Sequence, residues 1–579
     1  MPVPAAAESP FLDFRNTNSL WCSVLVETLV RCGVRAAVTC PGARSTPLTT
    51  ALARHPAIEA VPVLDERSAA FFALGRAKRS GCPVVLVCTS GTAAANFLPA
   101  IVEAHESGVP LLVITADRPP EQRACSSGQT IDQQKLFGGF VAFHHELAVP
   151  EARLELLGYL RQTVAHACAR AVQPHGAPVH LDAPFRDPLA PVADGTAEPL
   201  RGVLDATFFA HLSPDRPAAA SVTWTPPATA RGLIVAGPAS PADPAEYARE
   251  VGRLARTLGW PVLADALSPV RHHAAEGGTI VAHYDALLRD PQRAEALRPE
   301  AVLCLEGWPT SKVLRGWLER SRAEATLVAA TTANRDGLHL RTRQIAAGVA
   351  EVVIAAVRPE SDYAAAWARA EAATAARIEA ALEAETELFE PKAAWLLARH
   401  LPAETPVFVA SSMPVRDVEY FWPQNARQTR FHFNRGANGI DGTLSTALGV
   451  AQGGAPAVLL TGDLSLLHDT NGFLLRPKLR GSLTIVLIDN RGGGIFEHLP
   501  MAKFDPPFEE FFATPQEVDF AQLCAAYGVE HVAVRDWAQF VALVTELPTS
   551  GLRVLEIRTE RKRDAARRKA LLDGAPGRV

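Results

Sequence analysis

The sequence predicts an α/β fold made of three doubly wound parallel-sheet domains, and three observations carry this prediction. The chain has 579 residues, which exceeds what one hydrophobic core usually supports. Short apolar runs, such as residues 84–88 and 111–114, alternate with Ala- and Leu-rich stretches of helix length, as buried parallel strands and their covering helices do. The runs end in Gly, Ser, Thr or Asp, so polar residues gather at the carboxyl ends of the strands, where ligands bind in such sheets.

The apolar runs fall into three groups, which set the expected domain boundaries. A first domain is expected at residues 1–190, because a proline-rich stretch follows a strand-like run there. A linker rich in Pro, Ala and Thr is expected at 191–231, followed by a central Rossmann-like domain at 232–360. Residues 361–404 are Ala- and Glu-rich with helical spacing, which predicts a connecting helix, and residues 405–579 complete the chain as a third domain.

Composition and charge predict a cytoplasmic protein without nucleic-acid or membrane partners. The net charge of −5 offers no footprint for a polyanion, and the basic stretch at residues 561–569 is interpreted as an exposed helix end. No stretch approaches the length of a membrane helix, and residues 1–8 lack the pattern of a secretion signal. The nine cysteines show no Cys-x-x-Cys pairing and mostly lie in apolar segments, which indicates a reducing compartment and disfavours zinc binding.

A candidate metal site follows two apolar runs in the last third of the chain. Asp463 closes the run at residues 457–461, and Asn490 closes a second run 27 residues later. Magnesium takes near-octahedral oxygen ligands and keeps waters or phosphates, so Asp463, Asn490 and the carbonyl oxygen of Gly492 suffice as protein ligands. The spacing therefore indicates a magnesium ion that holds a diphosphate. The alternative interpretation is that Gly462 and Asp463 simply turn the chain after a strand.

This pattern resembles the thiamine diphosphate (ThDP) signature, in which Gly-Asp opens a segment that ends in an Asn pair, here Asp489 and Asn490. Enzymes with this signature need a carboxylic acid beside N1′ of the aminopyrimidine ring. Glu66 is the candidate, since it follows a strand-like run at residues 60–63 and begins a helical pattern. The alternative is that Glu66 caps the first turn of that helix and interacts with the helix dipole.

Five ordered blocks resemble the 2-succinyl-5-enolpyruvyl-6-hydroxy-3-cyclohexene-1-carboxylate (SEPHCHC) synthases, a ThDP-dependent family of menaquinone and phylloquinone biosynthesis. The blocks are residues 40–49, 65–68, 89–96, 115–121 and 434–442. The resemblance implies a transferase that decarboxylates 2-oxoglutarate and adds the succinyl carbanion to isochorismate. It also implies three domains of the ThDP-enzyme type, of which the first binds the pyrimidine and the third binds the diphosphate, with magnesium or manganese as the metal.

The resemblance implies roles for particular residues. Arg44, Arg118, Arg416 and Arg435 would bind the dianionic substrates, because guanidinium groups pair with carboxylates and stay charged when partly buried. Together with Glu66 and Ser412, Arg416 and Arg435 form the implied catalytic set, and Gln129, Ser412 and Lys312 are implied to contact substrate. Ile440 matches the bulky residue that holds the two cofactor rings in a bent form. The implied cofactor contacts are Glu66, Gly91, Gln129, Met413, Ile440, Gly462, Asp463, Leu464, Ser465, Asn490, Gly492, Gly494, Ile495 and Phe496.

Two positions depart from the family pattern, and both concern isochorismate. Ala43 stands where a serine usually precedes Arg44, and Val313 stands beside Lys312 where a second basic residue is frequent. Losing one hydroxyl hydrogen bond typically costs about 0.5 to 1.5 kcal/mol, which alters affinity without abolishing turnover. In this family the pyrimidine domain of one subunit meets the diphosphate domain of another. The resemblance therefore implies a homodimer or homotetramer with active sites at the subunit interface.

Two other functions compete with this interpretation. An acetohydroxyacid synthase or 2-oxoacid decarboxylase would share the fold, the metal and the glutamate, but those enzymes usually have glycine where Leu464 stands. A non-catalytic nucleotide- or flavin-binding regulatory protein could use the same sheets, yet it needs neither Glu66 nor cationic residues at several strand ends.

Overall fold

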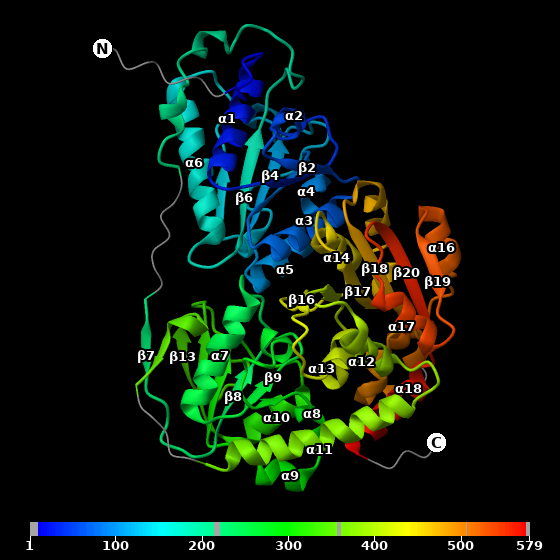
Figure 1. The fold of residues 1–579 in the computed structure, drawn as a ribbon. Coiled ribbons are helices and arrows are strands. Elements are labelled where there is room, and N and C mark those ends of the chain that lie inside the picture. The colour runs from blue at the N-terminus through cyan, green and yellow to red at the C-terminus, as the bar shows by residue number, and fades with distance from the viewer. Residues whose placement is uncertain (1–9, 213–219, 356–360, 505–506, 575–579) are drawn as a thin grey trace. The chain divides into compact units, whose positions relative to one another are not determined.

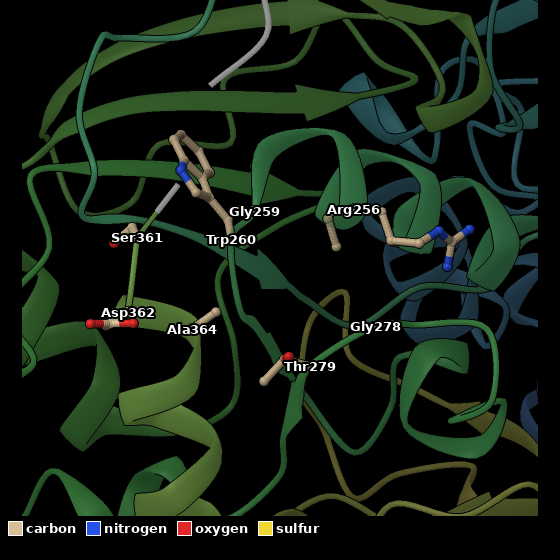
Figure 2. Close-up of a pocket in the computed structure, with 9 residues that line it drawn as sticks. Arg256, Gly259, Trp260, Gly278, Thr279, Ser361, Asp362 and Ala364 are labelled. Atoms are coloured by element: carbon tan, nitrogen blue, oxygen red, sulfur yellow. The ribbon is translucent and has the colours of Figure 1, made fainter. Parts of the chain in front are cut away.

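A computed structural model describes residues 10–212, 220–355, 361–504 and 507–574 (Figure 1). The chain divides into two compact units. The first comprises Met1–Pro217, Asn434–Gln452 and Asp469–Leu479, and the second comprises Ala218–Phe433, Gly453–His468 and Arg480–Val579. Two sequence predictions, the missing secretion signal in residues 1–8 and the domain boundary at residue 360, lie outside the described residues.

A parallel six-stranded sheet with the order β2-β1-β3-β4-β6-β5 forms the centre of the first unit. Its strands are β1 (Ala36–Thr39), β2 (Glu59–Pro62), β3 (Val84–Cys88), β4 (Leu111–Asp117), β5 (Phe143–Glu146) and β6 (Pro178–Pro184). The helices of the unit are α1 (Thr17–Arg31), α2 (Thr46–Arg54), α3 (Glu66–Ser80), α4 (Thr92–Ala95), α5 (Leu98–Ser107), α6 (Leu154–Val172) and α14 (Thr443–Ala451). Figure 1 shows α1 and α6 side by side over the sheet. Strands β3 and β4 are buried along their whole length, which is why their sequences are almost entirely apolar.

Helices α3 and α14 approach each other closely through two glycines. A Cβ atom on Gly75 would lie 2.0 Å from the carbonyl oxygen of Thr446, and one on Gly449 would lie 2.1 Å from the carbonyl oxygen of Phe72. Only glycine permits backbones to come this near. The contact joins the helix that begins at Glu66 to the helix that follows the segment 434–442.

The middle sheet, in the second unit, has the order β10-β9-β8-β11-β12-β13, which is the 3-2-1-4-5-6 order of a Rossmann fold. Its strands are β8 (Gly232–Ala236), β9 (Val262–Ala264), β10 (Ile280–Val281), β11 (Ala301–Leu305), β12 (Glu324–Ala329) and β13 (Arg341–Ala346). The accompanying helices are α7 (Pro244–Leu258), α8 (Tyr284–Leu287), α9 (Pro291–Ala296) and α10 (Lys312–Ser321). A two-stranded parallel ladder joins β7 (Val222–Trp224) to β14 (Val352–Ile354), so the stretch predicted as a linker contributes one strand.

The third sheet, also in the second unit, has the order β16-β15-β17-β18-β20-β19 and repeats the connectivity of the first. Its strands are β15 (Pro406–Val409), β16 (Arg430–Phe433), β17 (Ala457–Gly462), β18 (Ser482–Asp489), β19 (Glu530–Ala533) and β20 (Gly551–Arg558). The remaining helices are α11 (Tyr363–Ala384), α12 (Glu390–His400), α13 (Met413–Phe421), α15 (Asp463–His468), α16 (Phe520–Tyr527), α17 (Trp537–Thr545) and α18 (Arg561–Asp573). Three parallel α/β sheets are therefore present, which confirms the predicted fold class.

Residues 561–569 begin the helix α18, and Lys562, Arg563 and Lys569 are exposed, but the prediction of an exposed helix end is wrong for Arg561 and Arg568. Arg568 on α18 is 2 % exposed, and its guanidinium donates to the Asp417 carboxylate at 2.7 and 2.9 Å and to Glu390 at 2.6 Å. Arg561 is also buried and donates to Glu497 at 2.6 Å. A run of basic residues does not reveal which of them face acidic partners, because those partners come from distant parts of the chain.

The cysteines and the helices bear on the expectations from composition. All nine cysteines are free thiols, and most of them are buried. Among the described residues, no helix is long and apolar enough to cross a membrane.

Candidate active site

The predicted site residues of the first unit follow the carboxyl ends of three adjacent strands. Arg44 follows β1, Glu66 follows β2 and Gly91 follows β3. In the strand order β2-β1-β3, the strands that follow β1 in the chain lie on opposite sides of it, so the strand order reverses at β1. Ligands of open α/β sheets bind outside such a switch point. The fold therefore presents these three positions at one edge of one sheet.

Glu66 is the first residue of α3, and its carboxylate has no hydrogen-bond or ion-pair partner within the described part of the chain. The helix is capped instead by Asp65, whose side chain accepts a 3.0 Å hydrogen bond from the Ser68 amide. Asp65 also accepts a 2.6 Å hydrogen bond from the side chain of Asn471. The capping role considered for Glu66 thus belongs to its neighbour, and the Glu66 carboxylate remains available to a ligand.

Arg44 and Arg118 bring two guanidinium groups together at this edge of the sheet. Arg44 is 9 % exposed, donates to the Phe185 carbonyl at 2.9 Å, and has its Nε buried without a hydrogen-bond partner. Burial, and then the nearby charge of Arg118, lower the pKa of Arg44. Two like charges cost energy unless an anion compensates them. The pair is therefore suited to a substrate carboxylate.

Gly91 and Gln129 are held by a network of hydrogen bonds. The Ser90 hydroxyl donates to the Gln129 carbonyl at 3.0 Å, and the Gln129 side chain donates to the Ser90 carbonyl at 3.1 Å. Arg118 donates to the Ser90 hydroxyl and, at 2.8 Å, to the Gly128 carbonyl. Gly91 has φ +87°, and a Cβ atom there would lie 3.0 Å from Cγ of Gln129. Glycine at position 91 thus permits a close packing that any side chain would disturb.

The segment 434–442, which carries Arg435 and Ile440, is anchored within the same unit. Glu103 on α5 accepts hydrogen bonds from the amides of Gly436 at 3.1 Å and Ala437 at 2.7 Å. The Thr443 hydroxyl donates to the Ile440 carbonyl at 2.7 Å. Arg435 and Ile440 are both partly buried. The first unit therefore brings these two residues into one compact body with Arg44, Glu66, Gly91, Arg118 and Gln129.

The predicted metal ligands lie in the second unit, at the ends of the paired strands β17 and β18. The Asp463 carboxylate accepts hydrogen bonds from the Gly492 amide and the Leu464 amide, both at 2.7 Å. The Asn490 side chain donates to Glu390 at 2.7 Å, and its Oδ1 is buried without a hydrogen-bond partner in the part of the chain that the structure describes. A buried oxygen without a donor is costly unless another group compensates it.

This donor set fits a magnesium ion. Burial raises the pKa of Asp463 to about 7, because the ionised carboxylate is costly in a buried position. A bound cation would compensate this cost. Asp463, the orphaned oxygen of Asn490 and the Gly492 carbonyl are hard oxygen donors of the kind that magnesium prefers. Within the described residues, no cluster of three or more His, Cys, Asp or Glu side chains could hold a metal, so a metal site rich in carboxylates or thiolates is not available there.

Glycines shape the loop that follows Asn490. Gly492 has φ +129°, and a Cβ atom there would lie 2.3 Å from the Ala513 carbonyl oxygen. Gly494 lies close to Asn490 and Met413, since a Cβ atom on it would be 2.8 Å from Asn490 Nδ2 and 3.5 Å from Met413 Cγ. The next residues, Ile495 and Phe496, and the residues Gly462 and Leu464 beside the metal position are partly exposed, whereas Ser465 is buried. Gly492 thus lies beside Asp463, and Gly494 lies beside Asn490.

Helix α13 begins at the end of β15 with an unusual backbone conformation. Ser412, its N-cap, has φ +72° and ψ −130°, and its side chain makes no capping hydrogen bond. Such a conformation in a residue other than glycine costs about 1 to 3 kcal/mol and is typical of functional sites. Arg416 donates to the Ser412 carbonyl at 2.6 Å, and burial lowers the pKa of Arg416, with a further contribution from the nearby Arg315. Ser412, Met413 and Arg416 are therefore presented together.

Lys312 is exposed at the first position of α10, with Val313 partly buried beside it. The helix is capped by Ser311, whose hydroxyl accepts from the Leu314 amide at 3.1 Å and donates to Asp285 at 2.5 Å. The cap fixes the start of the helix, and the Lys312 side chain extends from it into solvent. No contact in the described residues ties Lys312 to the other predicted site residues.

Sequence reasoning missed the residues that hold the candidate site in place. Glu390 binds Asn490, and Gln133 binds the Gly91 amide at 2.9 Å. Neither lies in a motif, and each is far along the chain from its partner. No signal in the single sequence could have identified them.

Comparisons with known proteins match three consecutive parts of the chain to one group of enzymes. Residues 22–136 match the family model of the thiamine pyrophosphate enzyme N-terminal TPP binding domain, thiamine pyrophosphate being another name for ThDP. Residues 207–409 match the middle domain of thiamine pyrophosphate enzymes, and residues 415–557 match their C-terminal TPP binding domain.

Relatives of similar length share about half of their residues with this chain. A SEPHCHC synthase of Nostoc sp. (strain PCC 7120) is 50% identical over 568 residues, covering 95% of this chain and 97% of the relative. One from Synechococcus sp. (strain JA-3-3Ab) is 52% identical over 578 residues, covering 96% of each chain. One from Synechococcus elongatus is 50% identical over 570 residues, covering 98% of each. The chain therefore belongs to the family of thiamine diphosphate-dependent SEPHCHC synthases.

Proposed function

We propose that this enzyme decarboxylates 2-oxoglutarate with bound ThDP and adds the resulting four-carbon acyl anion to isochorismate in a 1,4-addition. The products are carbon dioxide and SEPHCHC, an intermediate of menaquinone or phylloquinone biosynthesis. The observation that carries the proposal is the similarity of the whole chain to relatives named for this synthase activity. The carboxylate of Glu66, the candidate metal ligands Asp463 and Asn490 and the guanidinium groups of Arg44 and Arg118 support the proposal.

Glu66 is the proposed acid beside the pyrimidine ring. When bound, ThDP supplies the electron sink that stabilises the carbanion left by departing carbon dioxide. Within the described residues the Glu66 carboxyl has no hydrogen-bond or ion-pair partner, so it can form a hydrogen bond to a ring nitrogen of a ligand. The cap provided by Asp65 fixes the start of α3 and hence the backbone position from which the Glu66 side chain extends.

Asp463, Asn490 and the Gly492 carbonyl are the proposed ligands of magnesium, with manganese as a substitute. The bond from Asn490 to Glu390 orients the amide so that Oδ1, rather than Nδ2, faces the metal position. The bond from the Gly492 amide to Asp463 ties the glycine loop to the first ligand. These contacts would prepare the loop to receive a diphosphate through its backbone amides.

The arginines are proposed to bind the carboxylates of both substrates. Arg44 and Arg118 form one cationic pair in the first unit, and Arg416 stands beside Ser412 in the second. Guanidinium groups can make two parallel hydrogen bonds to a carboxylate, which fixes its orientation as well as its position. Arg435, Lys312 and Gln129 are proposed to complete substrate recognition, and the Ser412 hydroxyl is proposed to hydrogen-bond a reacting oxygen.

We also propose a homodimer or homotetramer in the cytoplasm. Glu66 and Asp463 belong to different units of the chain, and a subunit interface is where two such half-sites meet in the family. The free thiols agree with a reducing compartment. Light scattering of the purified protein at several concentrations would give the oligomeric state.

An assay of carbon dioxide release tests the proposed reaction. Activity should require 2-oxoglutarate, ThDP and magnesium, and SEPHCHC should form only when isochorismate is also present. Omitting each component in turn identifies every requirement. Rapid carbon dioxide release from pyruvate, with none from 2-oxoglutarate, would favour an acetohydroxyacid synthase or 2-oxoacid decarboxylase and would overturn the proposal.

A further inference from the structure

Gln133 is a buried glutamine that connects the candidate site to the interior of the first unit. It is 1 % exposed and lies in the loop between β4 and β5. Its Oε1 accepts a 2.9 Å hydrogen bond from the Gly91 amide. Its Nε2 donates to Oδ1 of Asp182 at 2.9 Å and to the Ala116 carbonyl at 3.3 Å. Every polar atom of the side chain therefore has a partner.

The partners fix which way the Gln133 amide points. The Ala116 carbonyl only accepts hydrogen bonds, so the NH2 group must face it, and the oxygen must then face Gly91. Asp182 is fully buried at the end of β6 and is itself held by the Thr115 hydroxyl at 2.8 Å. The amide is thus anchored on the rigid part of the sheet, with only its oxygen directed at the loop after β3.

The position of Gly91 in turn sets the positions of two predicted site residues. Gly91 has φ +87° and ψ −145°, a conformation that few residues other than glycine adopt and that an amide acceptor can stabilise. Its neighbour Ser90 exchanges hydrogen bonds with Gln129 in both directions and accepts one from Arg118. A shift of the Gly91 amide would therefore move the anchor of both Gln129 and Arg118.

We propose that Gln133 is a positioning residue that holds the Ser90–Gly91 turn, and through it Arg118 and Gln129, in the geometry needed for substrate binding. This inference rests on the proposed function for the identity of the substrate. Gln133 itself has no free polar atom with which to touch substrate, so it acts through its neighbours. A displacement of about 1 Å in such a group can cost a hundredfold in rate.

The first test compares Gln133→Met with Gln134→Met. Methionine keeps the length and removes both hydrogen-bonding ends, while Gln134 donates to the same Asp182 carboxylate at 3.1 Å without contacting Gly91. Gln133→Met should lower kcat/KM for 2-oxoglutarate or isochorismate by about tenfold to a hundredfold, mainly through KM. Gln134→Met should change it less than about threefold. Equal losses in both variants, accompanied by equal drops in thermal unfolding temperature, would overturn the proposal.

A second test asks whether a second substitution, at Asp182, rescues a variant of Gln133. Gln133→Glu keeps an acceptor for Gly91 but has no hydrogen-bond donor for Asp182, and it sets two carboxyl groups against each other. This variant should lose about tenfold in kcat/KM. The double variant Gln133→Glu/Asp182→Asn restores a donor across the pair and should recover most of that loss. Failure of the second change to recover any activity would argue against orientation of the Gly91 amide as the cause.

Hydrogen–deuterium exchange separates this inference from the proposed function. The peptide containing Ser90 and Gly91 should exchange faster in Gln133→Met than in the wild type. In Gln134→Met this peptide should exchange at the wild-type rate. This readout needs no substrate. If the wild type fails to convert 2-oxoglutarate and isochorismate, the proposed function is wrong, while faster exchange still supports the positioning role. Unchanged exchange at this peptide would overturn the role of Gln133 whatever the reaction.

Discussion

Asn490 donates a hydrogen bond from Nδ2 to Glu390 at 2.7 Å, and its buried Oδ1 has no hydrogen-bond partner among the described residues. Glu390 in turn accepts a 2.6 Å hydrogen bond from Arg568 on the C-terminal helix. The orientation of one amide is therefore set by an ion pair from the far end of the chain. Groups that orient a metal ligand in this way usually matter nearly as much as the ligand itself.

Glu390→Ala should raise the magnesium concentration needed for half-maximal activity by about tenfold to a hundredfold, because the Asn490 amide loses its orienting partner. Titration of activity with magnesium at saturating ThDP measures the effect. Glu387→Ala is the matched control, since the exposed Glu387 side chain pairs with Arg563 and Arg567 and makes no hydrogen bond to Asn490 among the described residues. A normal magnesium requirement in Glu390→Ala would contradict the assignment of Asn490 as a ligand.

Two adjacent carboxylates, Asp65 and Glu66, should give opposite results when altered. Glu66→Gln should fold normally and bind magnesium and ThDP, yet lose most of its turnover, because the amide cannot transfer a proton. Asp65→Ala should lower the free energy of unfolding by about 1 kcal/mol, the usual value of an N-cap. Carbon dioxide release and urea-induced unfolding measure the two effects. Full turnover in Glu66→Gln would favour a non-catalytic binding protein.

Arg44→Met should raise the KM of an anionic substrate by about tenfold to a hundredfold, because a hydrogen bond to a charged group is worth about 1.5 to 3 kcal/mol. The change also removes the like charge beside Arg118, which offsets the loss of the favourable charges of Asp187 and Asp117 near Arg44. Arg54→Met serves as the control, as Arg54 is exposed and lies 3.6 Å from Asp13. The KM values for 2-oxoglutarate and isochorismate decide which substrate Arg44 binds, and no change in either would reject the role.

Arg568→Leu should lower the free energy of unfolding by about 3 to 5 kcal/mol, because it leaves the buried carboxylates of Asp417 and Glu390 unpaired. The neighbouring change Arg567→Leu removes a far more exposed arginine and should cost about 1 kcal/mol or less. Urea-induced unfolding of the two variants makes the comparison. Similar losses would restore the sequence-based view of an exposed basic helix.

The stability of the first unit should depend on pH through Asp182. Burial, and then the nearby Asp117, raise the pKa of Asp182 to about 7, above its value in an unfolded chain. As the pH rises, the Asp182 carboxyl therefore keeps its proton in the folded state after the same group in the unfolded chain has lost it. The resulting stability is present at acidic pH and is lost as the pH rises through 7. The charged or titratable groups around Asp182 include Asp117, Arg123 and Cys88, with Glu146 opposite it on β5 and His180 bound to the same Thr115 hydroxyl.

The Asp182→Asn variant provides the measurement. Wild type should lose stability relative to this variant between pH 5 and pH 8, by at least about 1.4 kcal/mol, the equivalent of one pKa unit. Thermal unfolding of both proteins at the two pH values gives the difference, which is independent of any constant cost of the substitution. A pH-independent difference would show that Asp182 does not take up a proton on folding.

Local patterns in the sequence predicted the strands well, because burial on both faces selects apolar residues. The runs at residues 84–88 and 111–114 became β3 and the start of β4, and polar residues follow each strand as expected. The same patterns did not predict the order of the strands within each sheet. That order differs between the middle sheet and the other two, since it depends on which strands pair across distant segments.

What the sequence by itself determined is the α/β class, the family motifs and the identity of the chemical groups, including Glu66, Asp463 and Asn490. The tertiary structure decided how those groups are held. The Gly91–Gln133, Asn490–Glu390 and Arg568–Asp417 pairs join residues 42, 100 and 151 positions apart. The periodicity of a sequence reports which side chains leave water, but a buried polar group is stabilised by one particular partner, and only the folded chain brings that partner within hydrogen-bond distance.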